Sequence, residues 1–240
     1  MLEQNSFKKG IKDGLPICFG YLSVAFAFGI FSVESGLSIW QALLISMTNV
    51  TSAGQLAAVP IIMAGGTLWE LALSQLVINL RYALMSVSLS QKLGKTINGF
   101  DRYAIAFMNT DEVFAVSTSN RGTVGKSYMY GLILTPFLGW SFGTFLGAGA
   151  GNILPALVTS ALGIAIYAMF VAIVVPEATN RKPTLLCVLF AIALSLCFNY
   201  IPQLKGMQSG FVIIICAVVA SLVFALVAPI DVKEEAVQND

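Results

Sequence analysis

The chain has no histidine, and its four cysteines show no C-x-x-C spacing. Structural zinc and iron–sulfur sites need clustered cysteine or histidine ligands, so we expect no metal site and no cofactor. Inert thiols in apolar surroundings are expected at all four positions: Cys18, Cys187, Cys197 and Cys216. A serine nucleophile would have no histidine base, and an aspartyl protease would lack its second intramembrane aspartate. The sequence therefore predicts a protein that is not an enzyme.

Charged residues are also scarce. Only 10% of the 240 residues are charged and 57% are hydrophobic, against about 25% and about 45–50% in an average globular domain. The net charge of +1 provides no basic stripe for binding nucleic acid. This composition predicts an integral membrane protein, in which residues 1–240 form a single polytopic domain within the lipid bilayer.

Long apolar segments predict an all-α membrane protein with about six full transmembrane helices. The six segments are residues 15–31, 67–90, 127–148, 155–175, 184–201 and 209–228. Lys8, Lys9 and Lys12 precede the first segment, so we expect residues 1–14 to form a cytoplasmic amino terminus. Residues 231–240 are expected to form a flexible acidic tail.

A further apolar segment, residues 38–65, is interrupted at its middle by polar and small residues. They are Thr48, Asn49, Thr51, Ser52, Gly54 and Gln55. Ser52 and Gln55 fit the S-x-x-Q capping box of a helix start. A helix that starts at mid-bilayer implies a broken or re-entrant segment. These residues either line a ligand pathway or form hydrogen bonds between helices without a ligand.

Residues 103–119 form a second interrupted segment, with Asn109, Thr110, Asp111 and Glu112 at its middle. Asn109 and Glu112 form a looser capping pattern, with acids in the first turn, where the helix dipole favours them. The two acids suit a proton relay or a partner for a substrate ammonium. The alternative is a dipole-stabilised cap, or an intramembrane ion pair with Arg81.

Residues 74–90 carry polar side chains on two helical faces, so this helix must be surrounded by protein or line a watery path. The polar side chains include Gln75, Asn79, Arg81, Tyr82 and Ser86. A guanidinium at the bilayer centre costs from about 3 to more than 10 kcal/mol, and a functional role is the default interpretation.

The interrupted segments leave two topologies open. If both cross fully, the chain has eight spans and Lys92, Lys95 and Arg102 lie outside. If both re-enter on the side from which they came, these residues lie inside with the amino terminus. The second arrangement satisfies the positive-inside rule better.

Four glycines recur at a spacing of four residues: Gly139, Gly143, Gly147 and Gly151. This small-xxx-small pattern lets two helix backbones approach closely. The partner is either another helix of this chain or another subunit.

The two helix starts suggest how a ligand would bind. Half-helix amino ends in transporters present free amides and partial positive charge to anionic groups near the midplane. We therefore expect seven substrate-binding residues: Asn49, Thr51, Ser52, Gly54, Gln55, Asn79 and Tyr82. Arg81, Asp111 and Glu112 are expected to form a coupling site or ion pair.

Short motifs spread over residues 14–147 also point to a known family. They are G-L-P at residues 14–16 with Gly20 and Tyr21, S-A-G-Q at 52–55, N-L-R-Y at 79–82 leading into Ser86 and Ser88, T-D-E at 110–112 with Phe114 and Ala115, and Gly139-Trp140 with Gly143, Thr144 and Gly147. In this order they resemble the AzlC family, the large subunit of bacterial branched-chain amino acid exporters.

The resemblance implies a secondary transporter that exports leucine, isoleucine and valine across the bacterial inner membrane. It also implies a small hydrophobic AzlD-type membrane subunit as partner. We expect export to be coupled to the proton gradient. The alternatives are a passive channel, an importer of another small zwitterion, or a membrane scaffold that docks a partner and transports nothing.

Overall fold

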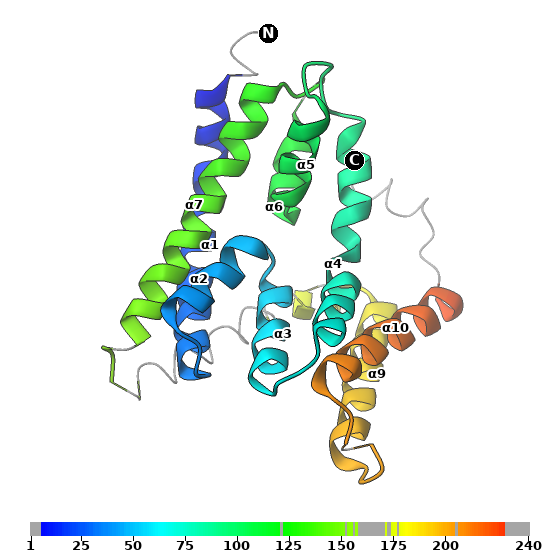
Figure 1. Cartoon of the computed structure of the whole chain (residues 1–240). Helices are drawn as coiled ribbons and strands as arrows, with labels where there is room; N and C mark the ends of the chain where they lie inside the picture. Colours follow the sequence, from blue (N-terminus) through cyan, green and yellow to red (C-terminus); the bar gives the residue numbers. More distant parts are fainter. Residues whose placement is uncertain are drawn as a thin grey trace. The chain divides into compact units, whose positions relative to one another are not determined.

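The computed structural model describes residues 6–120, 122–151, 153–155, 157, 171, 174–176, 178–204 and 206–228. The chain divides into two compact units, Met1–Gly65 with Ile78–Tyr167, and Gly66–Val77 with Ala168–Asp240. The described residues are almost entirely helical (Figure 1), which confirms the all-α prediction.

Five helices in the described part of the chain are long and apolar enough to cross a membrane. They are α1 (Phe7–Glu34), α4 (Leu68–Ser90), α7 (Lys126–Gly151), α9 (Lys182–Tyr200) and α10 (Ser209–Val227). The expected acidic tail and most of the expected span 155–175 lie outside the described residues.

Helix α1 begins earlier than the apolar run that predicted it. Ser6 is the N-cap, and its side chain accepts a hydrogen bond from the Lys9 amide. This cap lets the helix start at Phe7. The helix therefore extends beyond the expected apolar span 15–31, because apolar length alone does not reveal a polar capped turn. The cytoplasmic location of residues 1–14 stays a prediction.

Helices α1 and α7 run parallel and in close contact along their length (Figure 1). Small residues line this contact on both helices: Gly10, Gly14 and Gly29 on α1, and Gly131, Gly139, Gly143 and Gly147 on α7. A Cβ on Gly139 would lie 2.6 Å from the Cys18 carbonyl oxygen. The absence of side chains therefore lets the two backbones approach within contact distance.

The first interrupted segment forms helices α2 (Ile39–Thr48) and α3 (Ser52–Met63). Ser38 and Gln41 form a capping box at the start of α2, close to the end of α1. The end of α3 also lies close to the end of α1. Gly36 follows α1, and a Cβ on it would lie 2.9 Å from the methyl carbon of Met63, the last residue of α3. The segment therefore re-enters on the side from which it came.

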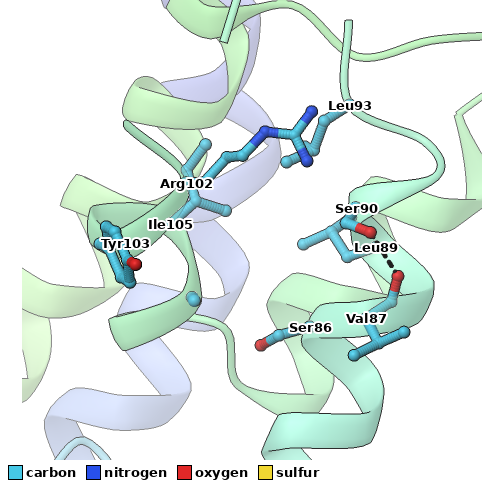
Figure 2. Close-up of a pocket in the computed structure, with 9 residues that line it drawn as sticks. Ser86, Val87, Leu89, Ser90, Leu93, Arg102, Tyr103 and Ile105 are labelled. Atoms are coloured by element: carbon cyan, nitrogen blue, oxygen red, sulfur yellow. Dashed lines mark hydrogen bonds between the residues drawn. The ribbon is translucent and has the colours of Figure 1, made fainter. Parts of the chain in front are cut away.

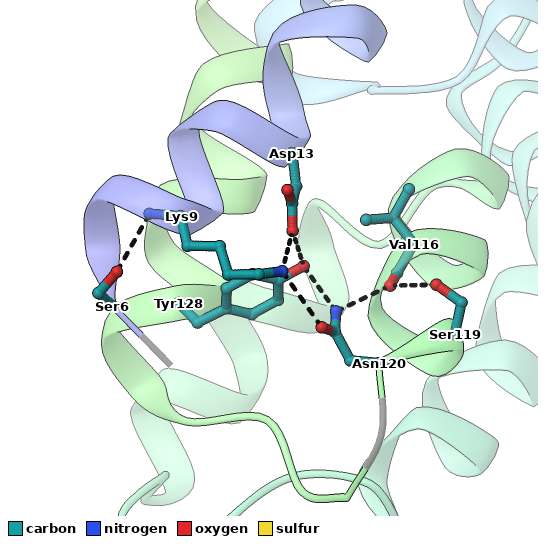
Figure 3. A network of polar contacts seen from close by, with 7 residues as sticks. All are labelled: Ser6, Lys9, Asp13, Val116, Ser119, Asn120 and Tyr128. Atoms are coloured by element: carbon teal, nitrogen blue, oxygen red, sulfur yellow. Dashed lines mark hydrogen bonds and ion pairs between the residues drawn. The ribbon is translucent and has the colours of Figure 1, made fainter. Parts of the chain in front are cut away.

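The second interrupted segment forms helices α5 (Gly99–Phe107) and α6 (Asp111–Ser119). At the start of α5, Asp101 accepts hydrogen bonds from Lys126 and Tyr130 in the first turns of α7. At the end of α6, Asn120 donates to the Tyr128 hydroxyl at 2.7 Å (Figure 3). Both ends of this segment thus lie beside the start of α7, so it is also re-entrant.

A polar network ties the end of α6 to α1 (Figure 3). The Asp13 carboxylate accepts hydrogen bonds from Lys9 at 2.7 Å and from the Tyr128 hydroxyl at 2.9 Å. Asn120 also donates to the Val116 carbonyl at 3.0 Å. This network attaches the end of α6, at the base of the α5–α6 hairpin, to α1.

The two hairpins enter from opposite ends of the parallel helices α1 and α7. Of the two topologies left open by the sequence, the structure has the re-entrant one, because each hairpin's two ends lie together. The ends of the α5–α6 hairpin share one side with Lys9, Lys92 and Lys126. These three lysines therefore lie at one end of the first unit, as the positive-inside rule requires.

In the second unit, α9 and α10 pack together, with Phe190 and Phe224 6.1 Å apart between ring centroids. The Glu70 carboxylate, from the first turn of α4, accepts a hydrogen bond from the Gly210 amide at 2.7 Å. This caps the start of α10 with a negative charge, where the helix dipole favours it. Nothing in the sequence predicted this contact between residues far apart in the chain.

Candidate functional site

The two helix breaks meet at one pocket of about 150 Å³ in the first unit. We call it the tip pocket. Its lining comes from the α2–α3 break, from α4 and from the α5–α6 break: Thr48, Asn49, Val50, Thr51, Asn79, Tyr82, Ala106, Phe107 and Asn109. Two hairpins that enter from opposite ends therefore enclose a common cavity with the middle of α4.

At the first break, Thr51 has an extended backbone (φ −149°, ψ 124°) and Ser52 is already the first helical residue of α3. Thr51 is therefore the N-cap, and its side chain makes no capping hydrogen bond. The predicted capping box between Ser52 and Gln55 was wrong, because it requires Ser52 to be the extended residue. Gln55 is only 1% exposed, and its amide atoms have no hydrogen-bond partner among the described residues.

At the second break, Thr110 is the N-cap of α6 and accepts a hydrogen bond from the Val113 amide at 3.4 Å. The sequence placed the cap one residue early, on Asn109. Asn109 instead reaches α4, where its side-chain nitrogen donates to the Ser86 hydroxyl at 3.3 Å. It is 2% exposed, so it is a buried polar residue on the pocket wall.

Unsatisfied polar atoms concentrate at this pocket. The Thr51 hydroxyl and the Asn109 side-chain oxygen are buried and have no hydrogen-bond partner among the described residues. An unsatisfied buried polar atom costs about 1–3 kcal/mol, so such atoms normally pair with water or a ligand. The pocket therefore offers hydrogen-bonding groups that the chain itself does not use.

The two helix starts differ in charge. Helices α3 and α6 both begin at the tip pocket, so both direct the positive end of their dipole towards it. Asp111 and Glu112 lie in the first turn of α6, whereas the first turn of α3 has no acid. The start of α3 is therefore the more favourable place for an anionic group.

Arg81 and the two acids form contacts beside the pocket rather than in its lining. The Arg81 guanidinium lies 2.8 Å from the Asp111 carboxylate and donates to the Tyr82 hydroxyl at 2.9 Å. The Tyr21 hydroxyl donates to the Glu112 carboxylate. These contacts join α1, α4 and the start of α6.

The structure brings together four of the seven residues predicted to bind a substrate: Asn49, Thr51, Asn79 and Tyr82 line the tip pocket. Ser52, Gly54 and Gln55 follow in α3 and do not line it. Asn109 was not among the residues predicted to bind a substrate, although a polar residue inside an apolar segment is a usable signal. Glu70 was also not predicted to have a role, although it is an acid inside the expected span 67–90 and is only 1% exposed.

The glycines of α7 face α1 within this chain. A Cβ on Gly143 would lie 2.5 Å from the Leu22 carbonyl oxygen, and one on Gly147 would overlap the Phe26 carbonyl oxygen. A Cβ on Gly151 would make only an ordinary contact, at 3.5 Å from the Ile30 Cα. At three of the four predicted glycines, Gly139, Gly143 and Gly147, the backbone of α1 therefore leaves no room for a side chain.

These features define an all-helical integral membrane protein with two re-entrant hairpins that meet at a polar pocket. The chain belongs to the AzlC family, because residues 16–154 match the family profile described as AzlC protein. The match covers both hairpins and most of the α1–α7 contact.

Relatives along most of the chain are also membrane proteins. The chain is 32% identical over 195 residues to "Inner membrane protein YgaZ" of Escherichia coli (strain K12), which covers 78% of each chain. It is 33% identical over 177 residues to an "Uncharacterized membrane protein" of Archaeoglobus fulgidus, covering 73% of this chain and 77% of the relative. A Helicobacter pylori membrane protein is 25% identical over 198 residues, or 78% and 86% of the two chains. No solved structure matches the chain.

Proposed function

We propose that this protein is a secondary transporter that exports branched-chain amino acids across the bacterial inner membrane. It acts as the large subunit beside a small AzlD-type membrane protein. The observation that carries the proposal is the meeting of two broken helices at one pocket with unsatisfied polar atoms. Broken helices that meet near the midplane form the substrate sites of many secondary transporters.

The substrate carboxylate binds at the start of α3. The Thr51 side chain does not cap this helix, so its hydroxyl can donate a hydrogen bond to a ligand. No acid in the first turn of α3 opposes a negative charge. The positive end of the helix dipole therefore favours an anion here.

The substrate ammonium binds at the opposite wall of the tip pocket. The Asn109 side-chain oxygen is a buried acceptor without a partner in the described part of the chain. An ammonium group has three donors and no acceptor, so it can satisfy this oxygen. Asp111, which the sequence suggested for this role, is occupied by Arg81 at 2.8 Å.

The size of the tip pocket suits a small aliphatic amino acid. A cavity of about 150 Å³ accommodates a molecule the size of benzene, and the tip pocket has about this volume. Val50, Ala106 and Phe107 supply apolar wall for the aliphatic group.

Asp111 and Glu112 supply the coupling to protons. Both acids lie in the first turn of α6, next to the tip pocket, and each contacts a different helix, through Arg81 or Tyr21. Protonation of Asp111 would weaken its attraction to Arg81 and so loosen α6 from α4. Binding of a proton could therefore change the shape of the pocket wall at the start of α6.

The orientation follows from the basic residues. Lys9, Lys92 and Lys126 share one end of the first unit, whereas the loop after α1 and the end of α3 contain no lysine or arginine. We place the basic end in the cytoplasm, with the amino terminus.

Export by cells that lack their own exporters tests the proposal. Cells that produce this chain with its small partner and are fed leucine-containing dipeptides should release leucine faster than cells without it. In vesicles, an imposed pH gradient should accelerate the release. Equal rates with and without a gradient would favour a passive channel, and no release of any neutral amino acid would favour a scaffold.

A further inference from the structure

A second pocket of about 250 Å³ lies between the end of α4 and α5 (Figure 2). We call it the apolar pocket. Figure 2 shows the Arg102 side chain of α5 extending towards Leu93, which follows the end of α4. Leu89 and Ile105 are each 1% exposed, so the floor of the pocket is part of the hydrophobic core.

The apolar pocket adjoins the tip pocket. Ala106 lines both of them. Ser86, on the wall of the apolar pocket, accepts a hydrogen bond at 3.3 Å from Asn109, on the wall of the tip pocket. The Ala106 methyl group and the Ser86–Asn109 hydrogen bond therefore lie between the two pockets.

Arg102 supplies the only charge in the lining of the apolar pocket. Within the described part of the chain, its guanidinium has no hydrogen-bond or ion-pair partner, whereas two nearby cations are paired: Lys126 with Asp101, and Lys92 with the Thr118 carbonyl. A guanidinium beside an apolar wall matches a ligand with a carboxylate at one end and an aliphatic group at the other.

We infer that the apolar pocket is a binding site for aliphatic carboxylates and the entry site for the substrate on the basic end. Arg102 holds the carboxylate, and Leu89 and Ile105 contact the aliphatic group. The substrate then passes the Ser86–Asn109 hydrogen bond to reach the tip pocket. The role as an entry site rests on the proposed function, but the binding of the carboxylate does not.

The test uses 4-methylpentanoate, which has the carboxylate and branched chain of leucine but no ammonium. Added to the purified protein in an uncharged detergent, it should raise the unfolding temperature with a saturable dose dependence. The uncharged amide of the same acid should have no such effect. Arg102→Gln should weaken the apparent affinity for the acid by about tenfold or more, because a charge-assisted pair is lost.

Lys95→Gln is the matched control. It removes the same charge from the same end of the first unit, but Lys95 does not line the pocket. It should leave the affinity for 4-methylpentanoate unchanged. Equal affinities for this acid in Arg102→Gln, Lys95→Gln and the unchanged protein would overturn the assignment of Arg102.

Two further readouts separate this inference from the proposed function. In an efflux assay, Arg102→Gln should raise the KM for leucine several-fold and leave the maximal rate unchanged. If no leucine is exported but the acid still binds through Arg102, the proposed function fails and the carboxylate site stands. If the acid does not bind and phosphatidylglycerol instead stabilises the protein through Arg102, the pocket is a lipid site and the inference is wrong.

Discussion

The Arg81 guanidinium lies 2.8 Å from the Asp111 carboxylate, and this contact joins the middle of α4 to the first residue of α6. The two side chains are 57% and 45% exposed, so the rest of the chain does not enclose the pair. Its importance lies in its position beside the tip pocket, where a change of charge can act on the hairpin without unfolding the protein.

Asp111→Asn should therefore leave the protein folded but abolish its response to a pH gradient. The amide cannot release a proton, so leucine efflux from vesicles should no longer be accelerated by the gradient. Glu34→Gln is a suitable control, because this exposed acid lies at the end of α1 away from the α5–α6 hairpin. If Asp111→Asn still exports leucine with an undiminished dependence on the gradient, Asp111 is not the coupling residue.

Gly147→Ala should destabilise the contact between α1 and α7. The added Cβ would overlap the Phe26 carbonyl oxygen, and relieving such overlap typically costs about 1–3 kcal/mol. Gly149→Ala is the matched control on the same helix, because a Cβ there meets nothing within 4 Å.

In thermal unfolding of the purified protein, Gly147→Ala should lower the midpoint. Gly149→Ala should leave it unchanged or raise it, since alanine favours helix by up to about 1 kcal/mol over glycine. Equal midpoints for the two variants would contradict the close packing of the helices at Gly147.

Asp101 should make the stability of the protein depend on acid pH. The hydrogen bond from Lys126 lowers the pKa of its carboxyl group, against the opposing effect of burial. A lowered pKa means that ionised Asp101 stabilises the folded state above its unfolded pKa of about 3.9, and that this contribution is lost as the pH falls further.

Asp101→Asn keeps an acceptor for the Asn98 amide but removes the charge that faces Lys126. At pH 7 the variant should unfold at a lower temperature than the unchanged protein, and the difference should shrink below about pH 4. A difference that stays constant from pH 7 to pH 3.5 would show that the charge of Asp101 does not stabilise the start of α5.

The sequence predicted the spans and the two breaks because both depend on local composition. Apolar length located α4 and α10 to within one residue, and the polar interruptions located the breaks near Thr51 and Asn109. Which residue caps each helix could not be predicted, since the cap depends on the backbone angles of Thr51 and Thr110 rather than on residue type.

The sequence suggested the contact between Arg81 and Asp111 as one alternative, but other contacts between distant residues were beyond prediction. Asn109 pairs with Ser86, 23 residues away, and the Glu70 carboxylate accepts a hydrogen bond from the Gly210 amide, 140 residues later in the first turn of α10. Nothing in the spacing of these residues links them. Periodicity could identify the glycine-rich face of α7, but the choice of α1 as its partner depends on the complementary glycines that α1 presents only after folding.

Leucine binding to the purified protein, together with its small partner subunit, tests the central claim that the two helix breaks form the substrate site. Thr51→Val removes the unsatisfied hydroxyl at the start of α3 while keeping its shape, and Thr135→Val makes the same change at a hydroxyl bonded to the Gly131 carbonyl, outside the tip pocket. We expect Thr51→Val to weaken leucine affinity by about tenfold and Thr135→Val to leave it unchanged. Unaltered leucine affinity in Thr51→Val, in a protein that binds leucine, would show that the start of α3 does not bind the substrate.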